Sequence, residues 1–371
     1  MRALRRIGLL ALIISFLTIN LCYAQSVAEQ NWTKGVVYAA QGKFKEAKGE
    51  FEKALKVDPF YGPAKRSLEV IEDAIGQKIK SKTAIHLFKG ISYGKKEHWD
   101  ESAAELNKAI ELNPGYAYAY HCRGLAYQNK GRHDQAISDY TKAIELNPRD
   151  AGAYVNRGIV YGRKGQHDQA ISDYTKAIEL NPRDARAYVN RGYAYQLKGQ
   201  HEKAISDYTR TIELNPGNTY AYYNRGLAYA QGKGQHDQAI SDYSKAIELN
   251  PRDADAYYNR GAAYQLKGQH DQTISDYTKA IELNPRDADA YYNRGVAYHL
   301  KGQHDQAISD YTKAIELNPR DAKAYCNRGV AMKKLGNMKK ACSDWKRACE
   351  LGDCRYWGIV SKIRCFGKLQ D

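Results

Sequence analysis

A fixed period of 34 residues constrains this chain more than any other feature of its sequence. The stretch AYVNRGIVYGRKGQHDQAISDYTKAIELNPRD at residues 153–184 is followed by AYVNRGYAYQLKGQHEKAISDYTRTIELNPGN at residues 187–218. Repetition of a unit of this size is typical of an array whose units stack on one another. It argues against a globular domain with a single core.

Each repeat contains two helical patterns. In the first, large and small residues recur at i, i+3, i+4 and i+7, which is one face of a helix. Gly165 then supplies the left-handed residue that ends this helix. A second stripe, made of Ala170, Tyr174 and Ala177, runs until Pro182 stops it. The sequence therefore predicts an antiparallel pair of helices in each repeat, here called A and B, and an all-α chain.

The residues at fixed offsets in each repeat resemble the tetratricopeptide repeat (TPR) family. In residues 153–184 they are Tyr154, Arg157, Gly158, Tyr161, Ala170, Tyr174, Ala177 and Pro182. The resemblance implies a TPR solenoid, a right-handed superhelix of antiparallel helix pairs with a concave groove. Two positions depart from the family pattern, because Tyr154 replaces the usual tryptophan and Arg157 replaces the usual leucine.

The arginine at the leucine position indicates an ionic link between repeats. Asp139 lies 18 residues before Arg157, and helix B of one repeat runs antiparallel to helix A of the next. We therefore expect contact across each repeat boundary. The same step gives Asp173–Arg191, Asp207–Arg225, Asp242–Arg260, Asp276–Arg294 and Asp310–Arg328, with Glu105–Arg123 and Asp344–Lys362 at the ends.

Recurring glycines set the domain boundaries. Eight tandem units over residues 83–355 are marked by Gly90, Gly124, Gly158, Gly192, Gly226, Gly261, Gly295 and Gly329. Residues 25–82 are expected to form a divergent first repeat plus an extra helix, whose place in the stack does not follow from the sequence. Residues 356–371 are predicted to form a capping helix, because a terminal repeat needs a polar outer face.

Residues 1–24 have the features of a secretory signal peptide. Basic residues precede an apolar run from Ile7 to Ile19, and Ala24 stands at the cleavage position. We expect cleavage near Ala24, which would make the mature protein periplasmic or secreted. The alternative is an uncleaved N-terminus that anchors the protein to a membrane.

The positive charge of the chain is concentrated at its C-terminal end. The formal net charge is +15, and residues 322–371 hold twelve basic and four acidic residues. No nucleic-acid-binding motif is visible, so nucleic acid is not an expected partner. The basic end can contact an acidic partner or an anionic membrane surface. Alternatively, it is a solvated face that aids solubility.

Four cysteines crowd the same end of the chain, namely Cys342, Cys349, Cys354 and Cys365. Four cysteines allow three pairings. The antiparallel step between neighbouring helices favours Cys342–Cys365, with Cys349–Cys354 across the turn. Their spacing is not a usual one for zinc ligands. We therefore expect disulfides, because export leads to an oxidising compartment.

The recurring histidines are not expected to bind a metal. They are His133, His167, His201, His236, His270 and His304. Packed helices lie roughly 8–10 Å apart, so neighbouring histidines cannot share an ion whose bonds are about 2 Å long. No nucleophile accompanied by a base is visible, and no glycine-rich phosphate loop follows a strand. The sequence thus predicts no enzyme activity, no catalytic residue and no cofactor.

A recurring asparagine is the better candidate for binding. Asn156, Asn190, Asn224, Asn259, Asn293 and Asn327 each precede the Arg-Gly pair on helix A. By resemblance, this position faces the concave groove. It is similar to the asparagine that clamps peptide backbone in chaperone-binding TPR domains and to the asparagine ladder of O-GlcNAc transferase. Aromatic neighbours facing the same side are Tyr220, Tyr223, Tyr258 and Tyr292. The alternative is a solvated polar position near the contact between A helices.

These features predict a non-catalytic scaffold or adaptor that binds an extended peptide or protein partner in its concave groove. A carbohydrate-binding factor in cell-envelope or exopolysaccharide assembly is the second hypothesis, because sugar rings also stack on tyrosines. A regulatory segment of an enzyme complex is the third.

Overall fold

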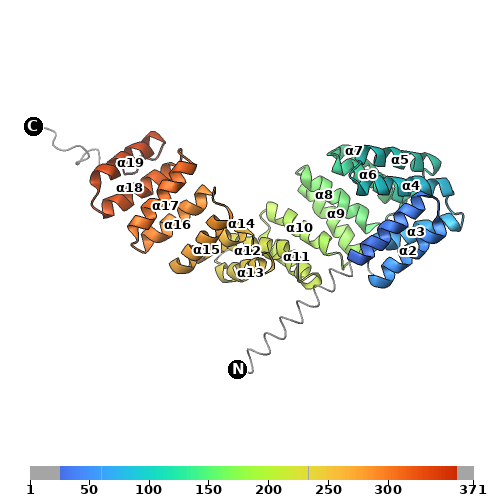
Figure 1. Ribbon diagram of the computed structural model, residues 1–371, viewed down its shortest axis with the longest axis horizontal. Coiled ribbons are helices and arrows are strands. Elements are labelled where there is room, and N and C mark those ends of the chain that lie inside the picture. Colours follow the sequence, from blue (N-terminus) through green and yellow to red (C-terminus); the bar gives the residue numbers. More distant parts are fainter. Residues whose placement is uncertain (1–25, 60, 233, 357–371) are drawn as a thin grey trace, which may run out of the picture. The chain divides into compact units, whose positions relative to one another are not determined.

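The computed structural model describes residues 26–59, 61–232 and 234–356, and these are helical, with no strand among them (Figure 1). One helix covers residues 26–40. The others are α2 (Phe44–Val57), α3 (Gly62–Ile75), α4 (Ser81–Lys95), α5 (Trp99–Leu112), α6 (Ala117–Asn129), α7 (His133–Leu146), α8 (Ala151–Arg163), α9 (His167–Leu180), α10 (Ala185–Leu197), α11 (His201–Leu214), α12 (Thr219–Gln231), α13 (His236–Leu249), α14 (Ala254–Leu266), α15 (His270–Leu283), α16 (Ala288–Leu300), α17 (His304–Leu317), α18 (Ala322–Lys334) and α19 (Met338–Glu350). The predicted all-α class is confirmed.

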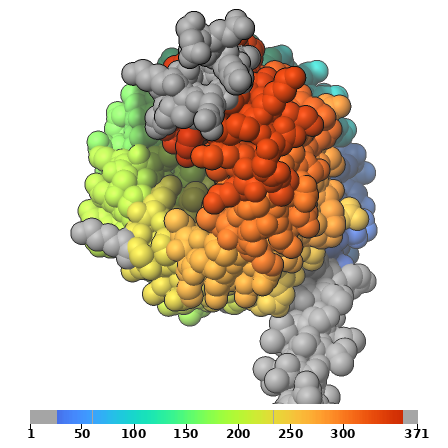
Figure 2. All heavy atoms as spheres, turned by 90° about the vertical axis from the view of Figure 1, so that its left-hand side faces the viewer, coloured from blue at the N-terminus to red at the C-terminus, as the bar shows by residue number. Residues whose placement is uncertain are grey.

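The chain divides into two compact units, which are described separately. The first ends at Ala187 and the second begins at Tyr188, within α10. From α4 onward, even-numbered helices are A helices and odd-numbered helices are B helices. In the second unit α12, α14, α16 and α18 each pack against their own B helix and the preceding one. Figure 2 shows these repeats, coloured yellow to red, following one another around a hollow.

Local chemistry explains where the helices begin and end. The carboxylate of Asp253 accepts a hydrogen bond from the backbone N–H of Ala256, and Asp287 does the same for Ala290, so each caps the start of a helix A. Gly165, with φ +74°, lies in the turn between α8 and α9. Only glycine adopts this left-handed conformation without strain, so the turn is fixed by its sequence.

Glycine and tyrosine form the contact between the two helices of each pair. A Cβ atom added to Gly158 would lie 2.7 Å from Cε1 of Tyr174. The equivalent rings are 3% exposed or less, and they are Tyr140, Tyr174, Tyr208, Tyr243, Tyr277 and Tyr311. These aromatic residues are therefore core, and the missing glycine side chain makes room for each ring.

The helix α3 breaks the pattern of pairs in the first unit. It packs against α2 and α4, and its Val70, Ile71 and Ala74 belong to the same core as the stacked rings of Phe51 and Phe88. On its other side, Arg66 reaches Asp150 at the start of α8. The extra helix thus connects the first helices of the unit to a repeat more than 80 residues away in sequence.

The last helix pair carries one of the two expected disulfides. Cys349, in the last turn of α19, is bonded to Cys354, which follows the helix. Cys342 is also disulfide-bonded, but its expected partner Cys365 lies outside the described residues. So do the expected signal peptide and, beyond residue 356, the expected capping helix. Among the helices that are described, none is long and apolar enough to cross a membrane.

Candidate functional site

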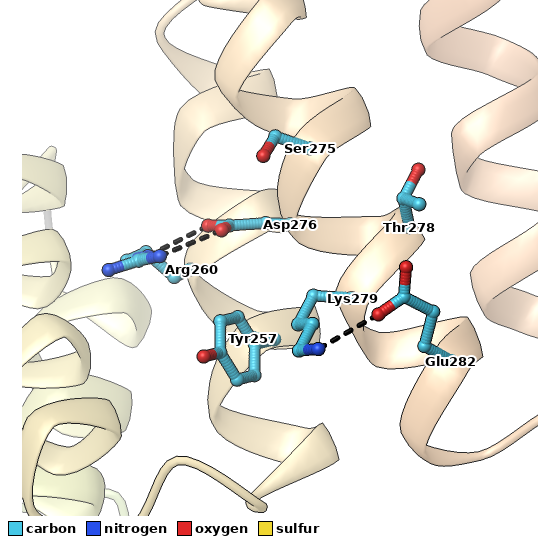
Figure 3. A pocket seen from close by; sticks show the side chains of 7 residues that line it. All are labelled: Tyr257, Arg260, Ser275, Asp276, Thr278, Lys279 and Glu282. Atoms are coloured by element: carbon cyan, nitrogen blue, oxygen red, sulfur yellow. Dashed lines mark hydrogen bonds and ion pairs between the residues drawn. The ribbon is translucent and has the colours of Figure 1, made fainter.

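The arginines of the A helices form ion pairs within each repeat. Arg260 of α14 binds Asp276 of α15 through two hydrogen bonds of 2.8 Å (Figure 3). The same bidentate pair occurs seven times, as Arg123–Asp139, Arg157–Asp173, Arg191–Asp207, Arg225–Asp242, Arg260–Asp276, Arg294–Asp310 and Arg328–Asp344. The predicted step across the repeat boundary was wrong, because each carboxylate binds the arginine of its own helix pair.

The close contact between glycine and tyrosine explains this choice of partner. Arg157 precedes Gly158 and Asp173 precedes Tyr174, so the contact between Gly158 and Tyr174 brings the ion pair together. The link between repeats comes instead from the remaining nitrogen, since Nη1 of Arg157 donates to Oγ1 of Thr141 at 2.9 Å. Arg157 therefore joins three helices, and through the equivalent hydrogen bond so do Arg123, Arg225, Arg260, Arg294 and Arg328.

Tyrosines cover the guanidinium groups of these arginines. The guanidinium carbon of Arg260 lies 5.7 Å from the ring centre of Tyr257 and 5.9 Å from that of Tyr264. Burial alone would lower the pKa of Arg260, but its hydrogen bond to Asp276 outweighs burial and raises the pKa. The seven Arg–Asp pairs are charged and half-buried, and their hydrogen-bonding groups are already used within the fold. They are a structural device, although the pair Arg260–Asp276 lines a depression of about 520 Å³ between α14 and α15.

The A helices lie on the inner side of the curve in the second unit. There α12 contacts α14 and α16 contacts α18 directly, whereas the described B helices make no comparable contact with one another. A stack in which A helices approach each other more closely than B helices must curve toward the A side. Side chains that point from the A helices away from their B partners thus line a concave face.

Three of the predicted asparagines form a ladder with tyrosines on this face. Nδ2 of Asn259 donates to the hydroxyl of Tyr223 at 2.9 Å, from one A helix to the preceding one. The other two rungs are Asn293 to Tyr258 at 2.8 Å and Asn327 to Tyr292 at 2.9 Å. We call these three pairs the Tyr–Asn rungs.

The tyrosine rings of the rungs pack against buried tyrosines of the B helices. The ring centre of Tyr258 lies 5.4 Å from that of the buried Tyr277, and Tyr223 and Tyr292 pack in the same way on Tyr243 and Tyr311. In the described structure the Oδ1 atoms of the three asparagines have no hydrogen-bond partner. The tyrosine hydroxyls accept a hydrogen bond and keep their own proton. Each rung thus presents one O–H donor and one amide acceptor.

The other predicted asparagines have different surroundings. Asn224 is only 4% exposed, and its Nδ2 donates to the backbone oxygen of Tyr220. Nδ2 of Asn156 lies 3.1 Å from Nε2 of His121 in the first unit. Asn190 lies on α10, beside the division between the units. The six asparagines therefore do not form one continuous ladder.

Two exposed tyrosines extend the concave face beyond the rungs. Tyr220, one of the predicted residues, is 49% exposed, and its ring centre lies 6.4 Å from that of Tyr193, which is 43% exposed. Tyr193 was missed by the sequence reading, because a tyrosine at its position occurs in only one repeat. Exposed, adjacent rings of this kind can bury apolar parts of a partner.

In the first unit a groove of about 510 Å³ lies between α3 and the A helices α4, α6 and α8. Trp99, Tyr118 and Leu125 are among the residues that line it. Because α3 covers this part of the inner face, the A helices of the first unit are less open to a long partner than those of the second. The Tyr–Asn rungs are therefore the better candidate site.

A buried polar network holds α3 on the first unit. Asp150 accepts hydrogen bonds from Nη2 of Arg66 at 2.5 Å, from His121 at 2.9 Å and from the backbone N–H of Ala153 at 3.2 Å. Burial works to raise the pKa of Asp150, but the hydrogen bond from His121 and the charges of His121 and Arg66 lower it below its ordinary value. Asn156 completes the network at the far nitrogen of His121.

We expect the network to make the first unit less stable in acid. A carboxyl whose pKa is lower in the folded state stabilises the fold above its unfolded pKa of about 3.9, and this contribution is lost as the pH falls further. We expect Asp150→Asn to cost about 1–2 kcal/mol at pH 7, since asparagine still caps the helix but lacks the charge. The difference from the parent should shrink below about pH 4. Urea unfolding monitored by circular dichroism at several pH values measures this, and a difference that stays constant down to pH 3 would contradict it.

The six recurring histidines all have similar surroundings. Each is the first residue of a B helix and is half-buried, with Nδ1 buried and unpartnered at all six positions. In the part of the chain that is described, no three metal-binding side chains come together. The geometry is that of rings packed one per repeat.

Comparison with known proteins agrees with this architecture. Models described as "Tetratricopeptide repeat" or "TPR repeat" match residues 28–61 and, in overlapping segments, residues 91–343. The chain belongs to the TPR family, which consists largely of interaction scaffolds with extended concave binding surfaces.

Solved structures of other TPR proteins are similar to parts of the chain. YrrB, titled a TPR protein with an unusual peptide-binding site, is 30% identical with a TM-score of 0.46, over 50% of this chain and 95% of YrrB. MamA is 32% identical with a TM-score of 0.43, over 45% of this chain and 96% of MamA. The C-terminal part of a TPR protein from Cytophaga hutchinsonii is 21% identical with a TM-score of 0.55, over 63% of this chain and 96% of that one. No curated protein matches the chain significantly.

Proposed function

We propose that this protein is an exported, non-catalytic scaffold that binds an extended peptide segment of a partner along α12 to α18. The Tyr–Asn rungs are the observation that carries the proposal. Each rung pairs a hydroxyl donor with an amide acceptor, and a peptide group needs one acceptor for its N–H and one donor for its C=O. Main-chain recognition of this kind does not depend on the partner's side chains. Export is inferred from the leader-like residues 1–24.

The rungs alone cannot give tight binding. A hydrogen bond contributes about 0.5–1.5 kcal/mol net, whereas association costs roughly 4–15 kcal/mol. Burial of the exposed rings of Tyr193 and Tyr220 must supply the remainder. We therefore expect weak to moderate affinity that tolerates different sequences.

Removal of the three tyrosine hydroxyls tests the proposal. The variant Tyr223→Phe, Tyr258→Phe, Tyr292→Phe keeps the rings but removes one donor per rung, so binding of extended peptides should weaken about tenfold or more. The matched control changes the preceding residues, Tyr222, Tyr257 and Tyr291, to phenylalanine. Those rings cover the arginines instead, and their loss of hydroxyls should leave binding unchanged.

A peptide array gives the readout, with a glycan array run in parallel. Equal binding by both triple variants would show that the rungs are structural. If the protein binds glycans and not peptides, and the triple variant at Tyr223, Tyr258 and Tyr292 loses this binding, the ligand is a carbohydrate.

A further inference from the structure

Two exposed carboxylates stand beside the Tyr–Asn rungs. Asp255 lies one helical turn before Asn259 on α14, and the backbone oxygen of Asp255 accepts a hydrogen bond from Nδ2 of Asn259 at 2.9 Å. Asp289 holds the equivalent place before Asn293 on α16. Both side chains are exposed, and neither forms an ion pair among the described residues.

Three other aspartates in these repeats form ion pairs. Asp276 and Asp310 bind arginines, and Asp271 forms an ion pair with Lys301. Asp305, on the B helix α17, is exposed and has no ion pair among the described residues. On the concave face, Asp255 and Asp289 likewise have no ion pair among the described residues.

The start of the helix does not explain these two acidic residues. A carboxylate in the first turn favours a helix slightly, but the same position is Lys323 in α18 and Tyr220 in α12. Asn218 and Asp321 already cap those two helices. The fold therefore does not require an acidic residue at the second position of an A helix, and a ligand can account for Asp255 and Asp289.

The carboxylates are close enough to affect the tyrosine hydroxyls. Burial raises the pKa of Tyr223, and the negative charge of Asp255 raises it further. Burial and then Asp289 act in the same way on Tyr258. Each of these two rungs therefore combines a hydroxyl, an amide oxygen and a negative charge.

We infer that the concave face formed by α12, α14 and α16 selects an extended peptide with lysine or arginine side chains, one for each of Asp255 and Asp289. This inference rests on the proposed function and names the class of its ligand. Charge complementarity supports it, because the concave face offers two unpaired carboxylates. The alternating O–H and amide groups of the rungs hold the backbone between them.

Helix spacing sets the expected spacing of the cations. Directly packed helices lie roughly 8–10 Å apart, and we take a similar spacing for α14 and α16, which the hydrogen bond from Asn293 to Tyr258 joins. A polyproline II segment advances about 3.1 Å per residue with three residues per turn, so every third side chain returns to the same face after about 9.3 Å. A lysine at every third position of such a segment matches one carboxylate per repeat.

The overall charge of the protein works against this binding. With a formal net charge of +15, long-range electrostatics disfavour a cationic peptide. A preference for lysine would therefore come from local carboxylates and not from the field of the whole chain.

Three peptides test the inference by fluorescence anisotropy at low ionic strength. The probes are labelled acetyl-(Lys-Ala-Pro)4-amide and the same peptide with glutamine or glutamate in place of lysine. We expect the lysine peptide to bind the full chain about tenfold more tightly than the glutamine peptide, and the glutamate peptide to bind most weakly. The variant Asp255→Asn, Asp289→Asn should reduce the lysine preference to about threefold or less.

Asp305→Asn is the matched control. Asp305 is the second residue of α17, as Asp255 is of α14, and it is exposed and has no ion pair among the described residues. It lies on a B helix and should leave the lysine preference unchanged. Equal binding of the lysine and glutamine peptides would overturn the inference and leave the proposed function standing. The same holds for an equal loss in Asp305→Asn. Absence of binding by all three peptides would overturn both.

Discussion

Arg260→Met is expected to lower the free energy of unfolding by about 3–5 kcal/mol. The change leaves the carboxylate of Asp276, only 5% exposed, without its two hydrogen bonds. Breaking a buried ion pair from one side is costly because the remaining charge stays out of water. The loss should occur even though an apolar residue at this position is closer to the TPR pattern.

The control for this prediction is Lys279→Met, at an exposed ion pair drawn in Figure 3. Lys279 and Glu282 form an ion pair of 2.8 Å on α15, but their side chains are 46% and 57% exposed. An exposed pair contributes about 0.2–1 kcal/mol, so Lys279→Met should change stability by less than about 1 kcal/mol. The two changes remove a similar volume and the same charge from neighbouring places.

A second variant separates the buried charge from the loss of packing. In Arg260→Met combined with Asp276→Ala, no unpaired carboxylate remains, so part of the lost stability should return. Urea unfolding measures the totals, and hydrogen exchange on α14 and α15 locates the loss, because repeat arrays do not always unfold in one step. A double variant less stable than Arg260→Met alone would contradict this explanation.

The local features of the fold could be read from the sequence. The 34-residue period, the glycine turns such as Gly165 and the stop at Pro182 act within one helix pair, where a few residues decide the conformation. The stripe of Ala170, Tyr174 and Ala177 that the sequence predicts is buried.

The partner of each arginine could not be read in the same way. Arg157 has an antiparallel neighbour on both sides, so Asp139 and Asp173 fit the helical spacing about equally well. The contact between Gly158 and Tyr174 brings Asp173, and not Asp139, to Arg157. This contact depends on how the two helices pack. The sequence indicated an ionic device but not its direction.

The candidate site shows the same limit. The asparagine positions were recognised by resemblance, but whether the amide is available depends on its neighbour in the preceding repeat. That neighbour is Tyr223 for Asn259 and Val189 for Asn224. The signal lies in the co-occurrence of a tyrosine and an asparagine about 35 residues apart, which only the spacing of packed A helices makes meaningful.

Gly158→Val should lower the free energy of unfolding by about 3 kcal/mol. The first added carbon would lie 2.7 Å from Cε1 and 3.0 Å from Cδ1 of Tyr174, a ring that is 3% exposed. The ring cannot move without separating α8 from α9, and overpacking of a filled core costs about 1–3 kcal/mol or more. Valine is a better helix former than glycine by a few tenths of a kcal/mol, which is too little to compensate.

Gly162→Val, one turn further along α8, is the matched control. The nearest atom to a Cβ there is the hydroxyl oxygen of Tyr174 at 3.9 Å, an ordinary contact distance. The same substitution on the same helix should therefore be neutral or slightly stabilising. Thermal unfolding of both variants, followed by circular dichroism at 222 nm, gives the comparison. Equal melting temperatures would mean that Tyr174 yields easily, and the close approach at Gly158 would then not be what fixes the helix pair and the arginine's choice of Asp173.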